Sequence, residues 1–401
     1  MKKGLLIFIG AFILISLIAI WAYLFFFGTP KSTDDVFANL GIGDTIERSE
    51  LEDSTPEPVA QIETPVPKKP LRQLTVRPAA GFFVPDIYEP TSIRYVERGT
   101  GHIFEVEIAT GNEMPITKFT VPQVVEAVFS PKGTSVIFTT YVDNVRNSFV
   151  GVLGNASGTT ELVNNIPLPP KADNVSYLDE QTILYTITTP AGTAGYRYHL
   201  DSQTQIQLFT IPLNSITMLW GNGLDSIYLY TKPTRLLEGF AYRVENNTLY
   251  RVGTGARGLM YFRNNTTEMR TTADLHDIYS EFTFGTSTVR TPVPFLPEKC
   301  AFIDSEAQIF WCGSSMEKLD PTFVEAWYKG ELSSPDGLWR IDAATGNMAM
   351  VSDLGLESGR EIDIQSIATS KLGHLVFFTN KLDGTIWLFD ALLAAGIDVS
   401  N

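Results

Sequence analysis

The segment SVIFTTY, residues 135–141, is one of six short apolar strands that recur along the chain and decide its fold. Successive copies start 43, 47, 44, 82 and 67 residues apart, and the 82-residue step holds one degenerate unit near TEMRTTA, residues 267–273. A period of 40 to 47 residues made of strands alone is what one four-stranded blade of a β-propeller requires. The other copies are SIRYVER (92–98), TILYTIT (182–188), SIYLYTK (226–232), QIFWCG (308–313) and LVFFTN (375–380).

Each unit reads as a meander of four antiparallel strands. In VVEAVFSPKGTSVIFTTY the turn FSPKG joins an inner strand to the next one, and in IFEVEIATGNEMPIT the dipeptide T-G marks a hairpin between the last two. The sequence therefore predicts an all-β, seven-bladed β-propeller, with six or eight blades as alternatives. Inner strands are expected to begin near Val76, Val124, Asn174, Ile216, Leu259, Cys300 and Ile364.

The last unit offers only three strands of its own. We expect LRQLT, residues 71–75, to supply its missing outer strand, because this segment precedes the first inner strand. Such closure joins the two ends of the ring and removes exposed sheet edges.

The N-terminal segment differs from the rest of the chain. Residues 4–27 carry no charge over 24 positions, which is about 36 Å of helix, enough to cross a bilayer. We predict a transmembrane signal anchor; a cleavable signal peptide is the competing interpretation. Lys2 and Lys3 place a stub of residues 1–3 in the cytoplasm, so the propeller, residues 71–401, would be extracytoplasmic at a bacterial cell membrane. Between them, residues 28–70 are acidic and Pro-rich, which is typical of an extended linker.

The formal net charge of −15 disfavours nucleic acid as a partner, because a phosphate backbone would be repelled. The two cysteines, Cys300 and Cys312, fall on neighbouring strands of one predicted hairpin. A loop of three or five residues would set them opposite each other, at a distance that suits a disulfide. Two small buried thiols are the alternative.

We find no motif that predicts catalysis, a metal or a cofactor. There is no G-x-S-x-G nucleophile motif, and the four histidines have no further ligand at metal-binding spacing. Enzymes with propeller folds can collect carboxylates from several blades at the axis. Four acidic residues next to inner strands could converge in that way: Glu126, Asp173, Asp225 and Glu298.

Residues 313–336, GSSMEKLDPTFVEAWYKGELSSPD, interrupt the repeat between the second and third strands of the sixth blade. Loops at that position share one rim with the links between blades. If exposed, the aromatic residues would suit a peptide or sugar partner; alternatively, they fold back and plug the channel. Candidate partner-binding residues on this rim are Trp327, Tyr328, Lys329, Arg146 and Arg235.

Two resemblances follow from these motifs. VFSPKGTSVIFTTY resembles the WD40-like repeat of TolB-type propellers. LPEKCAFIDSEAQIFWCG, WYKG and GLWRIDAATG resemble a family of single-pass, propeller-bearing envelope proteins from candidate-phyla bacteria, which implies placement and fold but no catalytic residue. We therefore expect an interaction or scaffold module with envelope or surface proteins as partners; the alternative is a glycan-binding or glycan-active propeller with an axial carboxylate site.

Overall fold

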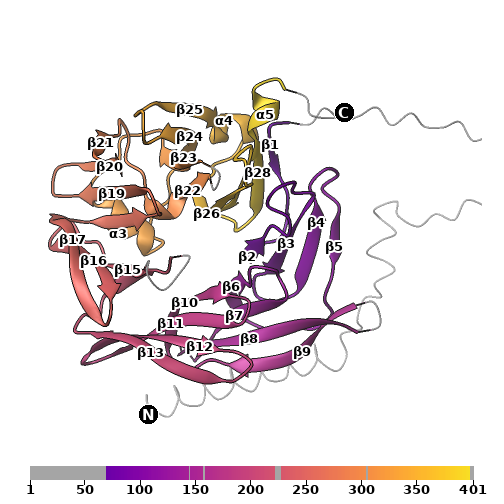
Figure 1. Cartoon of the computed structure of the whole chain (residues 1–401). Coiled ribbons are helices and arrows are strands. Elements are labelled where there is room, and N and C mark those ends of the chain that lie inside the picture. Colours follow the sequence, from indigo (N-terminus) through magenta and orange to yellow (C-terminus); the bar gives the residue numbers. More distant parts are fainter. Residues whose placement is uncertain (1–68, 144, 157–158, 222–226, 304–305, 398–401) are drawn as a thin grey trace, which may run out of the picture. The chain divides into compact units, whose positions relative to one another are not determined.

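The computed structural model describes residues 69–397, apart from residues 144, 157–158, 222–226 and 304–305. These residues form seven antiparallel sheets of four strands, arranged as the blades of a ring (Figure 1). The predicted seven-bladed propeller is confirmed. Among the described residues, no helix is long and apolar enough to cross a membrane. The predicted anchor at residues 4–27 lies outside the part of the chain that is described.

The first three blades each consist of four consecutive strands, here given from the inner strand outward. Blade 1 contains β2 (Ala79–Phe83), β3 (Ser92–Glu97), β4 (Ile103–Glu107) and β5 (Glu113–Pro115). Blade 2 contains β6 (Val124–Phe129), β7 (Ser135–Val142), β8 (Val145–Ala156) and β9 (Thr159–Pro167). Blade 3 contains β10 (Ala172–Asp179), β11 (Thr182–Thr189), β12 (Gly192–His199) and β13 (Thr204–Ile211).

Blades 4 to 6 repeat the pattern. Blade 4 contains β14 (Ile216–Leu219), β15 (Ile227–Thr231), β16 (Glu238–Glu245) and β17 (Thr248–Arg257). Blade 5 contains β18 (Met260–Arg263), β19 (Thr267–Ala273), β20 (Ile278–Phe284) and β21 (Ser287–Arg290), and the short 3-10 helix η2 (Pro297–Lys299) leads into the next blade. Blade 6 contains β22 (Cys300–Ile303), β23 (Glu306–Ser315), β24 (Asp336–Asp342) and β25 (Met348–Asp353).

Blade 7 is built from both ends of the described chain. Its inner three strands are β26 (Ile364–Thr369), β27 (Leu375–Asn380) and β28 (Ile386–Asp390), and its outer strand is β1 (Leu71–Gln73). β1 pairs with β28 in antiparallel register, with Leu71 opposite Phe389. This confirms that the segment at 71–75 closes the ring. In the described part of the chain, three short α-helices lie outside the sheets: α3 (Phe323–Tyr328), α4 (Leu354–Ser358) and α5 (Ala391–Ala394).

The hydrophobic core consists of seven clusters, each shared by two neighbouring blades. The second strand of a blade lies between two such clusters, which is why SVIFTTY is a continuous apolar run rather than an alternating one: Val136, Ile137 and Phe138 of β7 are all buried. Every blade therefore depends on both neighbours for burial of its two faces.

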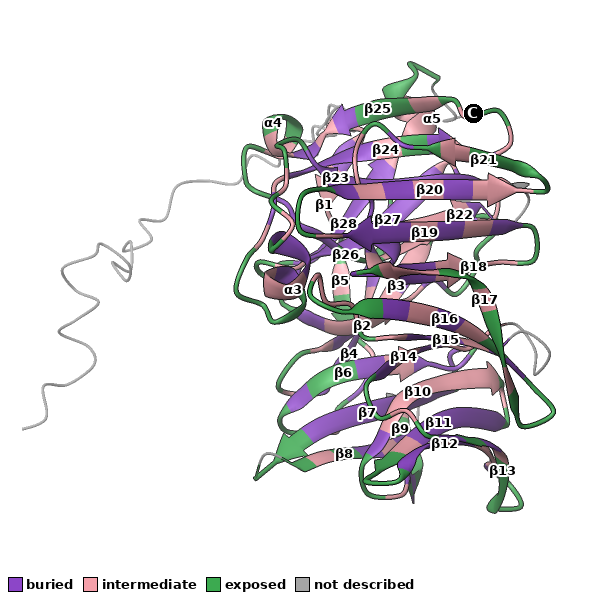
Figure 2. Cartoon of the chain, turned by 90° about the vertical axis from the view of Figure 1, so that its left-hand side faces the viewer, coloured by how far each residue is buried: buried purple, intermediate pink, exposed green. Residues whose placement is uncertain are grey.

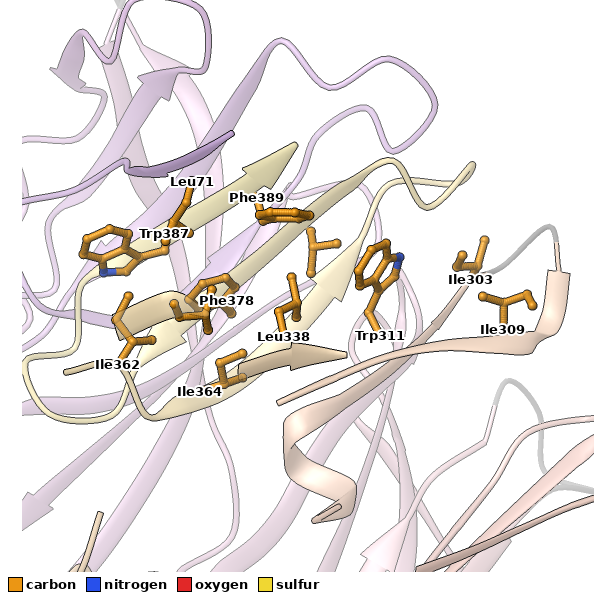
Figure 3. Packing of buried hydrophobic residues seen from close by; sticks show 12 residues of the cluster. Leu71, Ile303, Ile309, Trp311, Leu338, Ile362, Ile364, Phe378, Trp387 and Phe389 are labelled. Carbon is orange, nitrogen blue, oxygen red and sulfur yellow. The ribbon is translucent and has the colours of Figure 1, made fainter. Parts of the chain in front are cut away.

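The cluster between blades 6 and 7 includes the closing strand (Figure 3). Leu71 lies beside Trp387 and Phe389 of blade 7, and Trp311 and Leu338 come from blade 6. The Nε1 of Trp311 also donates a hydrogen bond to the carbonyl oxygen of Gly373, at 2.9 Å. The last blade thus reaches its full apolar burial only when the N-terminal strand is in place.

Cys300 and Cys312 form a disulfide between β22 and β23, where they stand directly opposite each other with a Cα–Cα distance of 4.1 Å. The predicted bond is confirmed. It joins the inner strand of blade 6 to its neighbour within one hairpin. Cross-linking so short a loop stabilises a fold by roughly 3 kcal/mol in the chain-entropy model.

Deletion of residues 71–75 should destabilise the propeller more than deletion of five residues from the predicted linker, such as 46–50. Loss of Leu71 alone removes about 1.5–3 kcal/mol of apolar burial, and the pairing of β1 with β28 is lost with it. Unfolding by urea measures both variants. Equal stabilities would contradict this mode of closure.

Candidate functional site

The insertion in blade 6 occupies residues 316–335, between β23 and β24, and carries α3. Because successive strands run antiparallel, links between the second and third strands lie at the same rim as the links between blades. Figure 2 shows α3 at this rim, beyond the ends of the neighbouring strands. One face of the helix, formed by Phe323, Val324 and Trp327, packs against blade 5 and the segment before η2.

Of the two alternatives for the aromatic residues, exposure to a partner does not hold for Trp327, whose exposed fraction is 3%. The indole belongs to one apolar cluster with Tyr261 of blade 5 and Leu296, and burial of so large an apolar surface stabilises this position. The alternative interpretation, in which the aromatic residues fold back on the propeller, describes Trp327. Lys329 is exposed, and Tyr328 is exposed in part.

A second face of α3 is fixed to blade 4. The Oε1 atom of Glu325 accepts hydrogen bonds from Thr234 Oγ1, at 2.6 Å, and from the backbone N–H of Arg235, at 2.9 Å. The bond from Thr234 and the bond from Arg235 hold the pKa of the Glu325 carboxyl below its usual value, against the effect of burial. The insertion therefore lies beside the loop that carries Arg235, and it spans the rim from blade 6 across blade 5 to blade 4.

Beneath α3, a buried cluster of charged residues joins blades 6 and 7. The Nζ of Lys299, at the end of η2, contacts Oδ2 of Asp336 at 2.7 Å and Oδ1 of Asp363 at 2.5 Å. The side chains of all three are at most 2% exposed. Asp336 opens β24, and Asp363 precedes β26, the inner strand of blade 7.

Polar groups of the insertion complete this ionic cluster. Trp327 Nε1 donates to Asp363, at 2.9 Å from Oδ2 and 3.1 Å from Oδ1. Lys381 lies 3.9 Å from Asp363 Oδ2 and donates to the backbone carbonyls of Trp327 and Leu332, each at 2.8 Å. Two lysines and two aspartates give a formally neutral set, which limits the cost of burial.

Desolvation acts strongly on this cluster. Burial raises the pKa of Asp336 to about 6, although the charge of Lys299 opposes the shift.

The ionic cluster was not predicted from the sequence, since SPDG at 334–337 has the composition of a turn. The available signal was weak: Asp363 lies between two isoleucines in EIDI, and Lys299 follows Glu298 directly in FLPEKC.

Glu298 has a different environment from its neighbour Lys299. Its carboxylate accepts a hydrogen bond from Tyr328 Oη at 2.6 Å and a weaker one from Tyr230 Oη at 3.3 Å. Burial raises the pKa of Glu298, and the hydrogen bonds from the two tyrosines oppose this. Tyr328 thus turns its hydroxyl inward although part of its ring is exposed.

Two of the other predicted carboxylates, Glu126 and Asp173, bind the same arginine. Arg146 binds Glu126 at 2.7 Å and Asp173 at 2.8 Å, so it bridges the inner strands of blades 2 and 3. Both acids are therefore paired with a cation rather than facing each other as an acid and base pair. Asp225 lies outside the described residues.

A cavity of about 720 Å³ runs along the inner strands of blades 7, 1 and 2, that is, along β26, β2 and β6. Its wall includes Phe82, Phe83 and Ile367. β2 and β6 approach closely, because a Cβ at Gly81 would lie only 1.9 Å from the carbonyl oxygen of Ala127. Only glycine permits this backbone contact.

The mouth of this axial cavity is polar. Glu126 and Gln365 lie near the starts of their inner strands, and Arg98 follows β3, so all three are at the rim that carries α3. Val125 also lines the cavity here and is 37% exposed. The cavity therefore combines an apolar wall with charged groups at one end, which is typical of binding sites.

Comparison with known proteins shows the fold and nothing finer. No protein-family model and no curated protein matches this sequence. An oligogalacturonate lyase solved in complex with manganese is 10% identical with a TM-score of 0.51, covering 80% of this chain and 92% of its own. The β-propeller domain of Cps50 (Swd1) from Myceliophteria thermophila is 6% identical with a TM-score of 0.51, covering 80% of this chain and 99% of its own. The predicted resemblance to propeller repeats is confirmed at the level of the fold.

The raised pKa of Glu298 predicts a pH-dependent stability. A carboxyl whose pKa is higher in the folded state stabilises the fold fully below its unfolded pKa, about 4.3, and loses this contribution as the pH rises through the folded value. The free energy of unfolding of the wild type, relative to Glu298→Gln, should therefore fall between about pH 4 and pH 7. Urea unfolding at both pH values measures this difference, and a difference that grows with pH would contradict the assignment.

Proposed function

We propose that this protein is a membrane-anchored, extracytoplasmic interaction module whose propeller binds a segment of an envelope or surface protein at the axial cavity. The observation that carries the proposal is the cavity along β26, β2 and β6, with its apolar wall and polar mouth. Each of these strands pairs with a neighbour on one side only within its sheet. Their axis-facing edges can offer backbone groups to an extended peptide, as sheet edges do in many complexes.

The geometry of the rim supports binding at the cavity rather than over the insertion. α3 is packed onto blades 4 to 6, and Trp327 is buried beneath it. The cavity lies in the sector of blades 7, 1 and 2, and α3 contacts blade 7 at Asp363 and Lys381, which do not line the cavity. Lys329 and the exposed part of Tyr328 remain candidate contacts for a larger partner.

Three features support the proposed location. The uncharged segment at residues 4–27 has the length of a membrane-spanning helix. The disulfide between Cys300 and Cys312 fits an oxidising compartment outside the cytoplasm. The acidic chain, with a net charge of −15, fits a soluble domain held away from an anionic membrane surface.

We also propose that the propeller binds and does not catalyse. What supports this is the pairing of the candidate carboxylates: Glu126 and Asp173 share Arg146, and Glu298 binds two tyrosine hydroxyls. A general acid and base would need to face a substrate with their pKa values separated by their surroundings. These described carboxylates are instead held by neighbours within the fold.

Val125→Trp tests the proposal, because it adds a large side chain at the mouth of the cavity without entering the core. The control is Val163→Trp on the outermost strand of the same blade, where Val163 is 61% exposed and does not line the cavity. Envelope proteins captured by the wild type should be lost with Val125→Trp, by at least about tenfold in affinity, or about 1.4 kcal/mol, and kept with Val163→Trp. Equal capture by both variants would place the binding surface elsewhere.

A further inference from the structure

The ammonium group of Lys299 is enclosed in a way that ordinary folding does not require. Lysine is rarely buried, and replacing a buried ion pair by apolar residues of similar volume is often neutral or stabilising. Here a lysine that is 2% exposed lies against two carboxylates, both of which belong to other segments of the chain. This arrangement places an amine nucleophile next to two carboxyl groups without access of bulk water.

We propose that Lys299 and Asp363 condense to form an intramolecular isopeptide bond between Nζ and Cγ, with Asp336 carrying the protons. The bond would join η2, at the start of blade 6, to the residue before the inner strand of blade 7. The two residues are 64 positions apart in sequence. The proposed bond does not depend on partner binding at the axial cavity.

Asp363 is placed as the electrophile. Its Oδ1 atom lies 2.5 Å from Lys299 Nζ. Its Oδ2 atom accepts hydrogen bonds from Trp327 Nε1 at 2.9 Å and from the backbone N–H of Ser334 at 3.3 Å, and Lys381 lies 3.9 Å away. Such donors stabilise the negative charge that develops on Oδ2 when an amine attacks the carboxyl carbon.

Asp336 is placed as the proton carrier. Both of its oxygens contact Lys299 Nζ, at 3.0 and 2.7 Å, and they also accept from Ser334 Oγ and the backbone N–H of Ile364. Burial raises its pKa to about 6, closer to that of a general base and acid at neutral pH than an exposed aspartate. Asp336 can take a proton from the ammonium group and return it to the leaving oxygen.

The reaction balances without a co-reactant. The lone pair of Nζ forms the C–N bond, and the bond from Cγ to Oδ1 breaks. Two protons leave the ammonium group, both are transferred to Oδ1, and this oxygen departs as water. No atom is oxidised or reduced. Burial of the cluster favours the amide, because the ion pair that it replaces is costly to desolvate.

The mass of the intact full-length wild-type chain tests the proposal directly. With the disulfide accounted for, the chain should be lighter than its sequence by one water. Trypsin should then release residues 291–318 joined to residues 361–371, since an acylated Lys299 resists cleavage. An unshifted mass, with residues 300–318 released free of 361–371 after reduction, would overturn the proposal; so would a link to residues 330–340, which contain Asp336.

Three variants assign the roles. Lys299→Arg keeps the positive charge and should show no mass loss. Asp336→Asn keeps both reacting groups but removes the proton carrier, so the linked fraction should fall at least about tenfold. Asp363→Asn should still react, with loss of one ammonia in place of water. A water loss that persists in Lys299→Arg would overturn the assignment of the nucleophile.

Discussion

The insertion and the junction between blades 6 and 7 depend on one interaction, the contact of Lys299 with Asp336 and Asp363. Other neighbouring blades combine an apolar cluster with polar contacts nearer the surface, such as that of Arg146 in blade 2 with Asp173 in blade 3. Between blades 6 and 7 an apolar cluster and a buried ionic cluster occur together. Removing one member of such a cluster costs roughly 3–5 kcal/mol, because the remaining charges are left buried without partners.

The same contact organises the insertion. Asp363 accepts from Trp327 and from the backbone of Ser334, and Lys381 donates to two carbonyls of the insertion. The insertion is thus bound to blade 7 at one side and to blade 4, through Glu325, at the other. The residues that line the axial cavity come from blades 7, 1 and 2 and not from the insertion, and the inner strands present an apolar wall there.

The regular part of the fold could be predicted because it is encoded locally. Each blade repeats within about 45 residues, and strand period, turn dipeptides and the missing strand of the last unit are all visible in one sequence. The pairing of Cys300 with Cys312 was also accessible, since both lie in one hairpin. Closure by LRQLT followed from counting strands.

Of the candidate site, the sequence predicts only where the insertion lies. The interruption at 313–336 locates it between two strands of blade 6, but burial of Trp327 depends on Asp363 and on blade 5, and neither is near it in sequence. Lys299 is separated from Asp336 by 37 residues and from Asp363 by 64, and isolated charges give no periodic pattern. The axial cavity likewise arises from three blades at once and has no local motif.

One buried cluster holds both the insertion and the closing blade in place. Hydrogen exchange in Trp327→Phe tests it, because phenylalanine keeps an aromatic side chain but removes the donor to Asp363. We predict faster exchange both in α3 and at the amide of Ile364, which donates to Asp336, with β7 of blade 2 unchanged. Faster exchange confined to α3 would contradict the claim.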